Sequence, residues 1–203
     1  MTNLILVRHG ESEWNKLGLW TGLTDIGLSA KGIQESALVG EKLKTFTIDI
    51  CYMSSLKRSG QTLDEIKKVL GRDFPTLENK SLNERDYGVY TGKNKWEIQK
   101  EVGEDKFQSI RRGWDSPIPE GETLKDVYNR VVPYYQQEIL PKLKSGKNVL
   151  IVAHGNSLRA LVKFLEGISD AEISNVELAT GEIYVYDIDK DGNVISKEKM
   201  IVR

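Results

Sequence analysis

Short apolar runs occur at intervals along the chain. Residues 4–7, 48–52 and 149–153 are largely apolar over four or five positions. Continuous apolar runs of this length are typical of strands buried on both faces of a largely parallel sheet. We therefore expect these three segments to lie in the interior of one sheet.

Between these runs, apolar residues recur with helical spacing. In residues 31–46 the apolar positions lie three or four residues apart, which predicts an amphipathic helix. A second helix is expected from Thr123 onward, because Thr123 and Asp126 have the spacing of a capping box. Pro133 lies inside this second pattern and should kink the helix or end its first part, because proline has no N–H group to donate.

The last third of the chain predicts one more helix and a hairpin. Asn156 or Ser157 can cap a helix that follows the last buried run directly, which gives a strand-turn-helix unit. Residues 182–188 and 194–202 have the pattern of strands and flank an Asp-Gly dipeptide at 191–192. This dipeptide is typical of a tight hairpin turn, so we expect antiparallel strands here.

Strands that alternate with helices predict an α/β fold. We expect a three-layer α/β/α sandwich, with a mostly parallel central sheet and antiparallel strands at its C-terminal end. The sequence has no internal repeat and no Pro-, Gly- or Ser-rich linker, and 203 residues suffice for one sizeable core. The prediction is a single domain over residues 1–203.

The charge of the chain is almost balanced. Lys and Arg number 29 against 30 Asp and Glu, a net charge of -1, so no overall field attracts nucleic acid or an anionic membrane. The apolar runs are far shorter than the ~18 residues of a membrane span. The start lacks the pattern of a signal peptide, and the single Cys51 cannot form an internal disulfide. We expect a cytoplasmic protein without nucleic-acid or membrane partners, and a homo-oligomer stays open.

The chain contains only two histidines, and both occur in the same context. His9 and His154 each follow a buried strand and precede a glycine, and Arg8 adjoins the first. Ligands of such sheets collect beyond the carboxyl ends of the strands, so the two imidazoles should meet at one edge. Arg8 supplies a forked cationic donor for an anion. The simplest ligand is a phosphate between two imidazoles.

Two other interpretations are less favoured. Two buried histidines with satisfied hydrogen bonds would not need matching strand-His-Gly contexts. A metal site is disfavoured because two histidines without a nearby Cys or carboxylate make a poor zinc or iron centre. Phosphoryl transfer suits the pair well, because an imidazole with a pKa of about 6.5 is already nucleophilic near neutrality. The second imidazole, as a cation, could stabilise the charge on the transferring group.

Several ordered segments carry a family resemblance. Residues 6–12 and 153–159 resemble the two signature motifs of the histidine phosphatase superfamily. Between these motifs, the segments at 14–15, 21–22, 55–58, 82–88 and 111–113 resemble those of the cofactor-dependent phosphoglycerate mutases and occur in the same order. The similarity runs from about residue 4 to about residue 185. The ordered set identifies the family, whereas an Arg-His-Gly triplet alone would not.

The resemblance implies an isomerase of glycolysis and gluconeogenesis. It would interconvert 2- and 3-phosphoglycerate through phosphorylated His9, primed by the cofactor 2,3-bisphosphoglycerate and without a metal. The implied catalytic residues are His9, Glu84, His154, Arg8 and Arg58. The implied substrate-binding residues are Ser12, Asn15, Thr21, Gly22, Arg85, Tyr87, Lys95, Arg111, Arg112, Gly155 and Asn156.

The family role of Glu84 is that of the acid and base at the substrate hydroxyl. A carboxyl group shielded from water among phosphates should have a raised pKa. Asp86, where relatives often have histidine, should raise the pKa of Glu84 further by like-charge repulsion.

Two departures from the family favour leakage to water. Only ten residues, 113–122, join the arginine pair to the next predicted helix, and we expect no polar tail after the last predicted strand. Less cover over a phosphohistidine would favour hydrolysis. A histidine phosphatase acting on small phosphomonoesters or on bisphosphoglycerate is therefore the alternative function, and a phosphate-binding module without turnover is a third.

Overall fold

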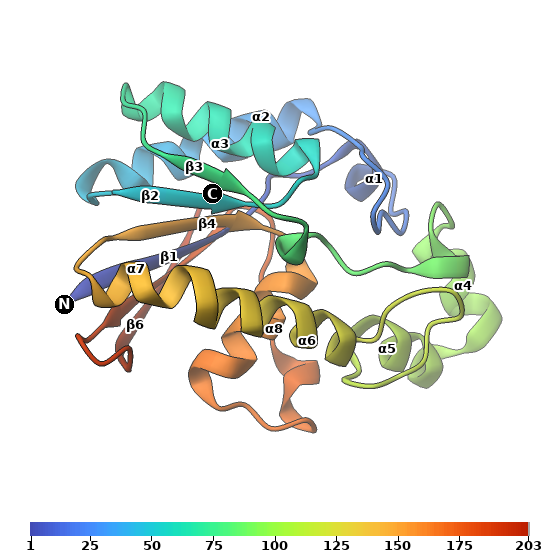
Figure 1. Ribbon diagram of the computed structural model, residues 1–203. Coiled ribbons are helices and arrows are strands. Elements are labelled where there is room, and N and C mark those ends of the chain that lie inside the picture. The colour runs from blue at the N-terminus through green and yellow to red at the C-terminus, as the bar shows by residue number, and fades with distance from the viewer. Residues whose placement is uncertain (203) are drawn as a thin grey trace.

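The computed structural model describes residues 1–202 and contains a single six-stranded sheet in that part of the chain. In chain order the strands are β1 (Thr2–Arg8), β2 (Ile50–Met53), β3 (Thr76–Glu78), β4 (Val149–Ala153), β5 (Glu182–Ile188) and β6 (Val194–Ile201). Their order across the sheet is β3-β2-β4-β1-β5-β6. Figure 1 labels all of these strands except β5. The first four form parallel pairs, whereas β5 runs antiparallel to both β1 and β6. The predicted mixed sheet is confirmed.

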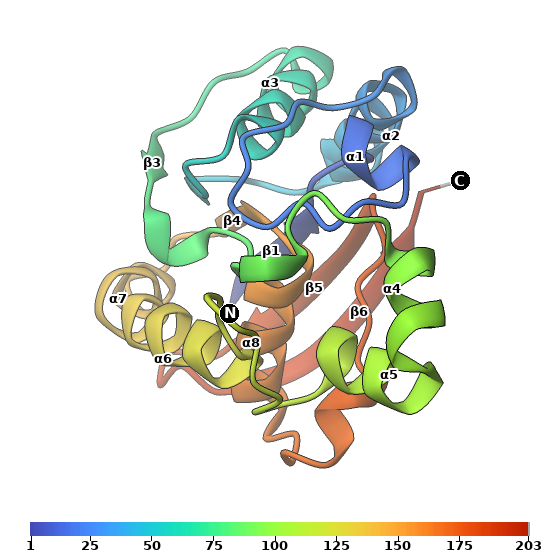
Figure 2. The same cartoon turned by 90° about the vertical axis from the view of Figure 1, so that its right-hand side faces the viewer.

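Helices cover both faces of the sheet, as Figure 2 shows. The α-helices are α1 (Glu13–Lys16), α2 (Ala30–Lys42), α3 (Lys57–Leu70), α4 (Lys95–Val102), α5 (Glu104–Arg112), α6 (Leu124–Tyr134), α7 (Leu140–Lys144) and α8 (Gly155–Glu166). Short helical turns are η1 (Leu43–Thr45), η2 (Lys80–Leu82), η3 (Gly88–Tyr90), η4 (Tyr135–Ile139) and η5 (Glu172–Asn175). Helices α2 and α3 lie on one face, and α6, α7 and α8 lie on the other (Figure 1).

The pleat of β1 divides the core into two layers. Leu4 and Leu6 belong to the cluster shared with α6 and α8, whereas Ile5 and Val7 belong to the cluster shared with α2 and α3. Side chains of successive strand residues point to opposite faces, so a strand buried on both sides must be apolar throughout. This requirement explains the continuous apolar runs from which the inner strands were predicted.

The helix predicted from Thr123 onward consists of three consecutive helical segments, α6, η4 and α7. Thr123 caps α6 through the expected capping box with Asp126. Pro133 lies in the last turn of α6, and the helix then widens into the π turn η4 before α7 begins. Regular α-helical geometry therefore ends just after the proline, as predicted, because its ring removes one hydrogen-bond donor.

The predicted cap of α8 is wrong by two or three residues. His154, rather than Asn156 or Ser157, is the N-cap, and its N–H donates to the hydroxyl of Ser157 at 3.2 Å. The helix begins this early because no turn separates it from the end of β4. His154 is therefore fixed between strand and helix. Gly155 and Asn156 lie in the first helical turn, so their backbone N–H groups have no carbonyl acceptor within the helix.

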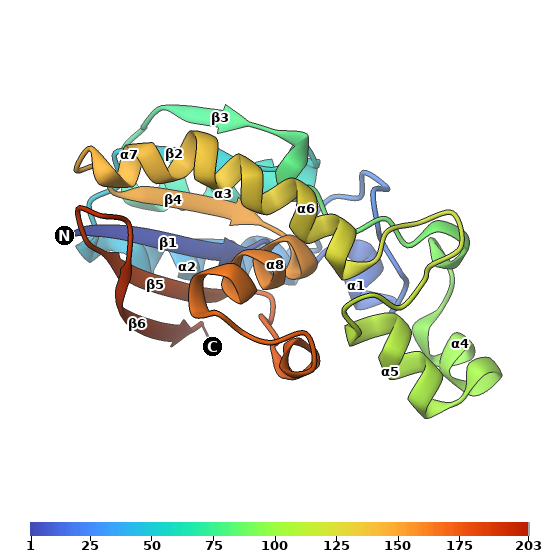
Figure 3. The same cartoon turned by 60° about the horizontal axis from the view of Figure 1, so that its bottom comes forward.

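A small helical unit lies beyond the carboxyl ends of the parallel strands. Helices α4 and α5 project from this end of the sheet, as Figure 3 shows, and pack around Trp20 and Phe107. No helix within residues 1–202 is long and apolar enough to cross a bilayer. The interior between the α4–α5 unit and the sheet edge is where the two histidines meet.

Candidate active site

The two histidines lie in contact at the edge where β1 and β4 end. Their ring centroids are 4.8 Å apart with an interplanar angle of 58°. The N–H of His9 donates to the carbonyl of Ala153 at 3.0 Å, which joins the two strand ends. Rings at this separation are in van der Waals contact. A phosphate cannot lie between them, so the expected sandwich is wrong, and an anion must bind beside the pair.

A hydrogen bond of His9 leaves one of its ring nitrogens with a free lone pair. Nδ1 lies 2.6 Å from the carbonyl oxygen of Gly10, and only a protonated nitrogen can donate to a carbonyl. Nε2 therefore carries the lone pair. Burial, together with Arg58 and Arg8, holds the pKa of His9 well below 6.5, so the ring is neutral at pH 7. His9 is part of the wall of a cavity.

His154 lies behind His9 and is fully buried. Its Nε2 is 2.6 Å from the hydroxyl of Ser54, and its Nδ1 has no hydrogen-bond partner within residues 1–202. Burial and the charge of Arg58 hold its pKa well below 6.5. The ring is therefore neutral before a ligand binds, which corrects the expectation of a cation. A phosphoryl dianion nearby would raise the pKa.

The first part of the cavity surrounds His9. It is lined by Arg8, His9, Asn15, Thr21, Gly22, Arg58, Glu84, Tyr87 and Lys95. Arg58 is almost completely buried and donates to the carbonyls of Thr24 at 2.9 Å and Gly22 at 2.9 Å. Arg8 Nε and Thr21 Oγ1 are buried polar atoms without a partner in the described chain. Unsatisfied donors of this kind are costly unless a ligand uses them, so this part has the chemistry of an anion site.

Glu84 lies at the centre of the cavity and is held by three donors. Its Oε1 accepts from the N–H of Arg85 at 2.8 Å, and from the N–H and side-chain amide of Asn156 at 3.1 and 3.0 Å. Burial acts to raise its pKa, but these hydrogen bonds and the nearby arginines outweigh burial, and the pKa lies below its ordinary value. The predicted upward shift is wrong, because these donors and arginines stabilise the charged form of Glu84. The carboxylate of Asp86 accepts from the N–H of Gly88 at 2.8 Å. Glu84 is a carboxylate at pH 7.

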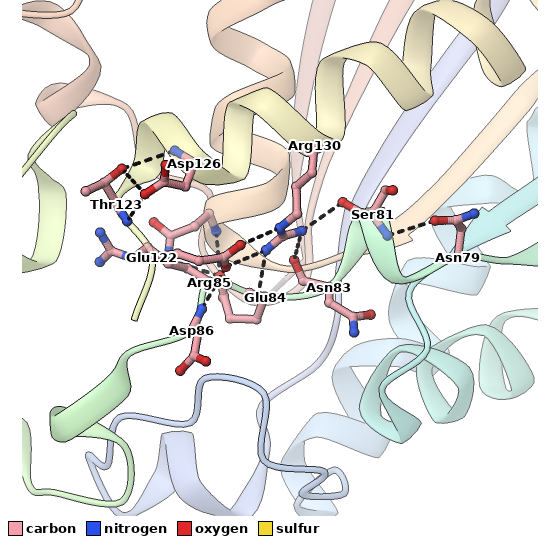
Figure 4. Close-up of polar contacts among 11 residues, drawn as sticks. Asn79, Ser81, Asn83, Glu84, Arg85, Asp86, Glu122, Thr123, Asp126 and Arg130 are labelled. Atoms are coloured by element: carbon pink, nitrogen blue, oxygen red, sulfur yellow. Dashed lines mark hydrogen bonds and ion pairs between the residues drawn. The ribbon is translucent and has the colours of Figure 1, made fainter. Parts of the chain in front are cut away.

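Arg130 fixes the main chain that carries Glu84, as Figure 4 shows. Its guanidinium donates to the carbonyls of Ser81, Asn83 and Glu84 at 2.8, 3.0 and 3.0 Å. The same group forms a bidentate ion pair with the carboxylate of Glu122, with N···O distances of 2.8 and 2.9 Å. Because a guanidinium is planar and rigid, these acceptors are held in one plane. The backbone before Glu84 is thereby tied to α6.

The second part of the cavity opens toward α4 and α5. It shares Arg8, Glu84, Tyr87 and Lys95 with the first part and adds Trp20, Arg111, Arg112, Gly155, Asn156, Arg159, Glu177 and Leu178. Burial, with Arg8 and Arg111, lowers the pKa of Lys95 to about 8. Lys95 and the arginine pair therefore belong to the cavity wall and not to a solvated helix face. One continuous cavity holds cations at both ends and a carboxylate between them.

Three predicted site residues have other places. Ser12 is buried as the N-cap of α1, and its hydroxyl accepts from the N–H of Asn15 at 3.1 Å. It holds the helix that presents Asn15 to the cavity. Arg85 is fully buried beneath the wall and donates to the carbonyl of Ile110 at 2.9 Å, which ties α5 to the Glu84 loop. His154 supports His9 from behind. The remaining predicted residues line the cavity.

Gly10, which follows His9, is needed for close packing of the backbone. A Cβ atom on Gly10 would lie 2.2 Å from the carbonyl oxygen of Gly32 in α2, closer than any real contact. A Cβ on Gly155 would instead meet the guanidinium of Arg8 at 3.4 Å, an ordinary contact distance. The first glycine therefore lets the His9 loop lie against a helix backbone, which the sequence alone did not indicate.

Sequence reasoning assigned no role to four residues of the site. Ser54 follows the end of β2, a position that could have suggested it, since the neighbouring strands also end at the site. Arg159 lies three residues after Asn156 on α8 and donates to its Oδ1 at 2.9 Å. This bond directs the amide N–H groups toward Glu84 and Tyr87. Trp20 and Glu177 lack a local signal, because tertiary folding alone brings them to the wall.

The sequence matches a known family along nearly all its length. The family model for the Histidine phosphatase superfamily (branch 1) matches residues 4–199. A phosphoglycerate mutase from Schizosaccharomyces pombe is 48% identical over 198 residues, which cover 96% of this chain and 94% of that protein. A 2,3-bisphosphoglycerate-dependent phosphoglycerate mutase from Parvibaculum lavamentivorans is 44% identical over 203 residues, 98% of this chain and 97% of that protein.

Solved structures share the fold. YhfR from Bacillus stearothermophilus has a TM-score of 0.84 at 25% identity, covering 96% of this chain and 95% of that chain. A mycobacterial glucosyl-3-phosphoglycerate phosphatase also has a TM-score of 0.84, at 20% identity, covering 99% of this chain and 98% of that chain. The second likeness concerns the fold alone.

Proposed function

Because the chain belongs to branch 1 of the histidine phosphatase superfamily, we propose that it is a 2,3-bisphosphoglycerate-dependent phosphoglycerate mutase, an isomerase that interconverts 2- and 3-phosphoglycerate. One observation carries this proposal. The cavity has cations at both ends, Arg8 and Arg58 beside His9 and the pair Arg111 and Arg112 farther out. Phosphoglycerate has two anionic groups, whereas a simple phosphomonoester needs only one such end.

His9 is the proposed nucleophile. Its neutral ring and free Nε2 lone pair allow it to take a phosphoryl group near pH 7 without a separate base. Arg8 and Arg58 would bind the phosphoryl oxygens, and Asn15 would add an amide donor. His154 would support the charge that develops there through its buried Nδ1. Phosphorylated His9 would donate this group to the free hydroxyl of a monophosphoglycerate. The bisphosphate that forms would reorient and return its opposite phosphoryl group to His9, which leaves the isomer.

Glu84 is the proposed proton carrier at the substrate hydroxyl. Transfer from His9 requires that hydroxyl to lose its proton, and a carboxylate with a lowered pKa can accept it. When His9 takes back the other phosphoryl group, protonated Glu84 returns the proton to the oxygen that is released. Tyr87, Lys95 and the arginine pair would hold the substrate carboxylate and its second phosphate during this exchange.

The residues at His9 fit the cofactor. The unpaired buried atoms Arg8 Nε and Thr21 Oγ1 are donors for phosphate oxygens, and Lys95 adds a cation within reach of both ends. When bound, 2,3-bisphosphoglycerate supplies the phosphoryl group that primes the enzyme. Within residues 1–202, no group of three or more His, Cys, Asp or Glu side chains is placed to hold a metal ion. A cytoplasmic location and a role in glycolysis and gluconeogenesis accompany this proposal, and the oligomeric state stays a prediction.

The test combines a label with a product analysis. The protein is incubated with 2,3-bisphosphoglycerate carrying ³²P, and acid-labile protein phosphate is measured; then unlabelled 3-phosphoglycerate is added. We expect label on the wild type and formation of 2-phosphoglycerate, with neither in His9→Ala. Inorganic phosphate as the main product, without isomer, would replace the mutase with the histidine phosphatase alternative. Absence of any label would contradict both enzymes and leave a binding module.

A further inference from the structure

Glu177 places a carboxylate on the arginine pair inside the cavity. Its Oε1 lies 2.6 Å from the guanidinium of Arg112 and 3.9 Å from that of Arg111. All three residues line the second part of the cavity. The arginines that would receive the second anionic group of a ligand are therefore already paired within the chain.

The backbone of this segment is fixed, whereas the carboxylate is exposed. The carbonyl of Val176 accepts from Arg159 at 2.8 Å, that of Glu177 from the hydroxyl of Tyr184 at 3.1 Å, and that of Leu178 from Arg8 at 2.5 Å. The side chain of Glu177 is 53% exposed, while that of Arg112 is only 16% exposed. Glu177 can thus swing into solvent while the arginines stay in the wall.

We propose that Glu177 is an internal counter-ion that competes with the ligand for Arg111 and Arg112, and so sets how tightly the site holds a molecule with two anionic groups. The choice of ligand rests on the proposed function. A guanidinium pair bound to Glu177 must exchange that carboxylate for the carboxylate or second phosphate of the ligand. The displaced Glu177 also remains near the cavity mouth, where like charges repel.

The size of the effect follows from the exposure of the pair. Half-exposed ion pairs contribute modestly, so removing the competitor should strengthen binding by about two- to fivefold. The replacement Glu177→Gln keeps the shape of the side chain and removes only its charge. Binding of a ligand that has a phosphate but no carboxylate should change little, because it does not need the arginine pair.

The experiment compares two ligands by isothermal titration calorimetry. For 3-phosphoglycerate we expect the Kd of Glu177→Gln to fall about two- to fivefold, and for glycerol 3-phosphate to stay constant. KM for 3-phosphoglycerate should fall in parallel without a fall in kcat. Glu41→Gln is the matched control, because the side chain of Glu41 is also 53% exposed and forms an ion pair with Lys44 at 2.7 Å. Glu41 lies near the end of α2 and does not line the cavity. That control should change neither constant.

Opposite results separate the possibilities. An unchanged or higher Kd for 3-phosphoglycerate in Glu177→Gln and in Glu177→Ala would overturn the proposal, because Glu177 would then be inert or would position the arginines. An equal gain for both ligands would also overturn it, since a general charge effect would suffice. Both readouts are binding constants, so they hold even for a protein that produces phosphate and no isomer. Failure of the mutase assay is therefore a distinct result.

Discussion

The rings of His9 and His154 are in contact, at a centroid separation of 4.8 Å, although 144 residues lie between them in the chain. They meet because β1 and β4 are parallel neighbours, with Arg8 in register with Ala153. The contact is unequal, since His9 lines the cavity and His154 lies behind it. Two motifs that look alike in sequence therefore have different positions, which fits the proposed tasks of one ring as nucleophile and the other as support.

Replacing each histidine should separate these tasks. His9→Ala should abolish acid-labile labelling by 2,3-bisphosphoglycerate, because alanine has no nitrogen that can accept the phosphoryl group. His154→Ala should keep the label but form it about 10²- to 10³-fold more slowly, the usual cost of removing one donor to a developing charge. Rapid-quench labelling measures both rates. Label on His154 in the His9→Ala protein would reverse the assignment.

The buried, neutral histidines should make stability fall at mildly acidic pH. Their pKa values lie well below 6.5 in the folded protein, whereas the unfolded chain binds protons near pH 6.5. Below that pH the unfolded state holds more protons, so the free energy of unfolding decreases as the pH falls from about 6.5 to 5. Each histidine contributes at most about 1.4 kcal/mol per pH unit. Above pH 6.5 this contribution is constant.

Urea denaturation at pH 7.5, 6.5 and 5.5 measures this dependence. His154→Gln should decrease the slope below pH 6.5 by the share of one histidine, and saturating phosphate should oppose the loss by favouring protonated His154. The ordinary carboxylates titrate near pH 4, outside this window. Equal free energies of unfolding at pH 7.5 and 5.5 would show that the rings take up protons as readily in the folded protein.

The sequence predicted the architecture where burial dictates the pattern. The run at 149–153 coincides with β4, because a central strand has no polar face, and the capping box at Thr123 begins α6 as expected. The edge strand β3 was not predicted, because its three residues are all exposed and lack an apolar signal.

The site could be predicted through its motifs but not through its geometry. Residues next to strand ends were found because topology brings strand ends together. The relative placing of the two rings, the lowered pKa of Glu84 and the carboxylate of Glu177 depend on segments remote in sequence. A buried carboxyl group with few donors has a raised pKa, and only the folded chain shows that Glu84 has three.

Glu84→Gln should slow proton transfer more than it weakens binding. The amide keeps an acceptor for Asn156 but cannot take the hydroxyl proton, so kcat for isomerisation should fall about 10²- to 10⁴-fold. The Kd for 3-phosphoglycerate should change by much less. Stopped assays for kcat and calorimetry for Kd provide the comparison. Mutase turnover equal to that of the wild type would remove Glu84 from the mechanism.

Lys95 should give ligand binding a dependence on alkaline pH. Its pKa of about 8 means that it loses its charge in the free protein as the pH rises from 7 to 9. Since the cation binds the anionic ligand better, the Kd for 3-phosphoglycerate should rise about tenfold over this range. In Lys95→Arg the charge persists, so this rise should largely disappear. Lys93→Arg, at an exposed position, should behave like the wild type, and a flat wild-type profile would contradict the prediction.

Arg130 should be needed for both stability and turnover. Arg130→Ala removes the donor to the carbonyls of Ser81, Asn83 and Glu84 and leaves Glu122 without its ion-pair partner, with only the N–H of Asp86 as a donor within the described residues. We expect the free energy of unfolding to fall by about 2–3 kcal/mol, since several partly buried acceptors lose their bonds together. In Arg130→Lys the charge remains but the planar fork is lost, so part of the loss should persist. Urea denaturation measures both variants.

The exposed neighbour on α6 provides the control for Arg130. Lys125→Ala should change the free energy of unfolding by less than about 0.5 kcal/mol, as is usual for a surface position. A positioning role also requires a kinetic effect. Arg130→Lys should decrease kcat for isomerisation and the rate of His9 labelling together, because both steps would use the proton carried by Glu84, while the Kd for 3-phosphoglycerate should change much less. A Kd that rises by as much as kcat falls would mean that Arg130 supports the whole fold and does not specifically orient Glu84.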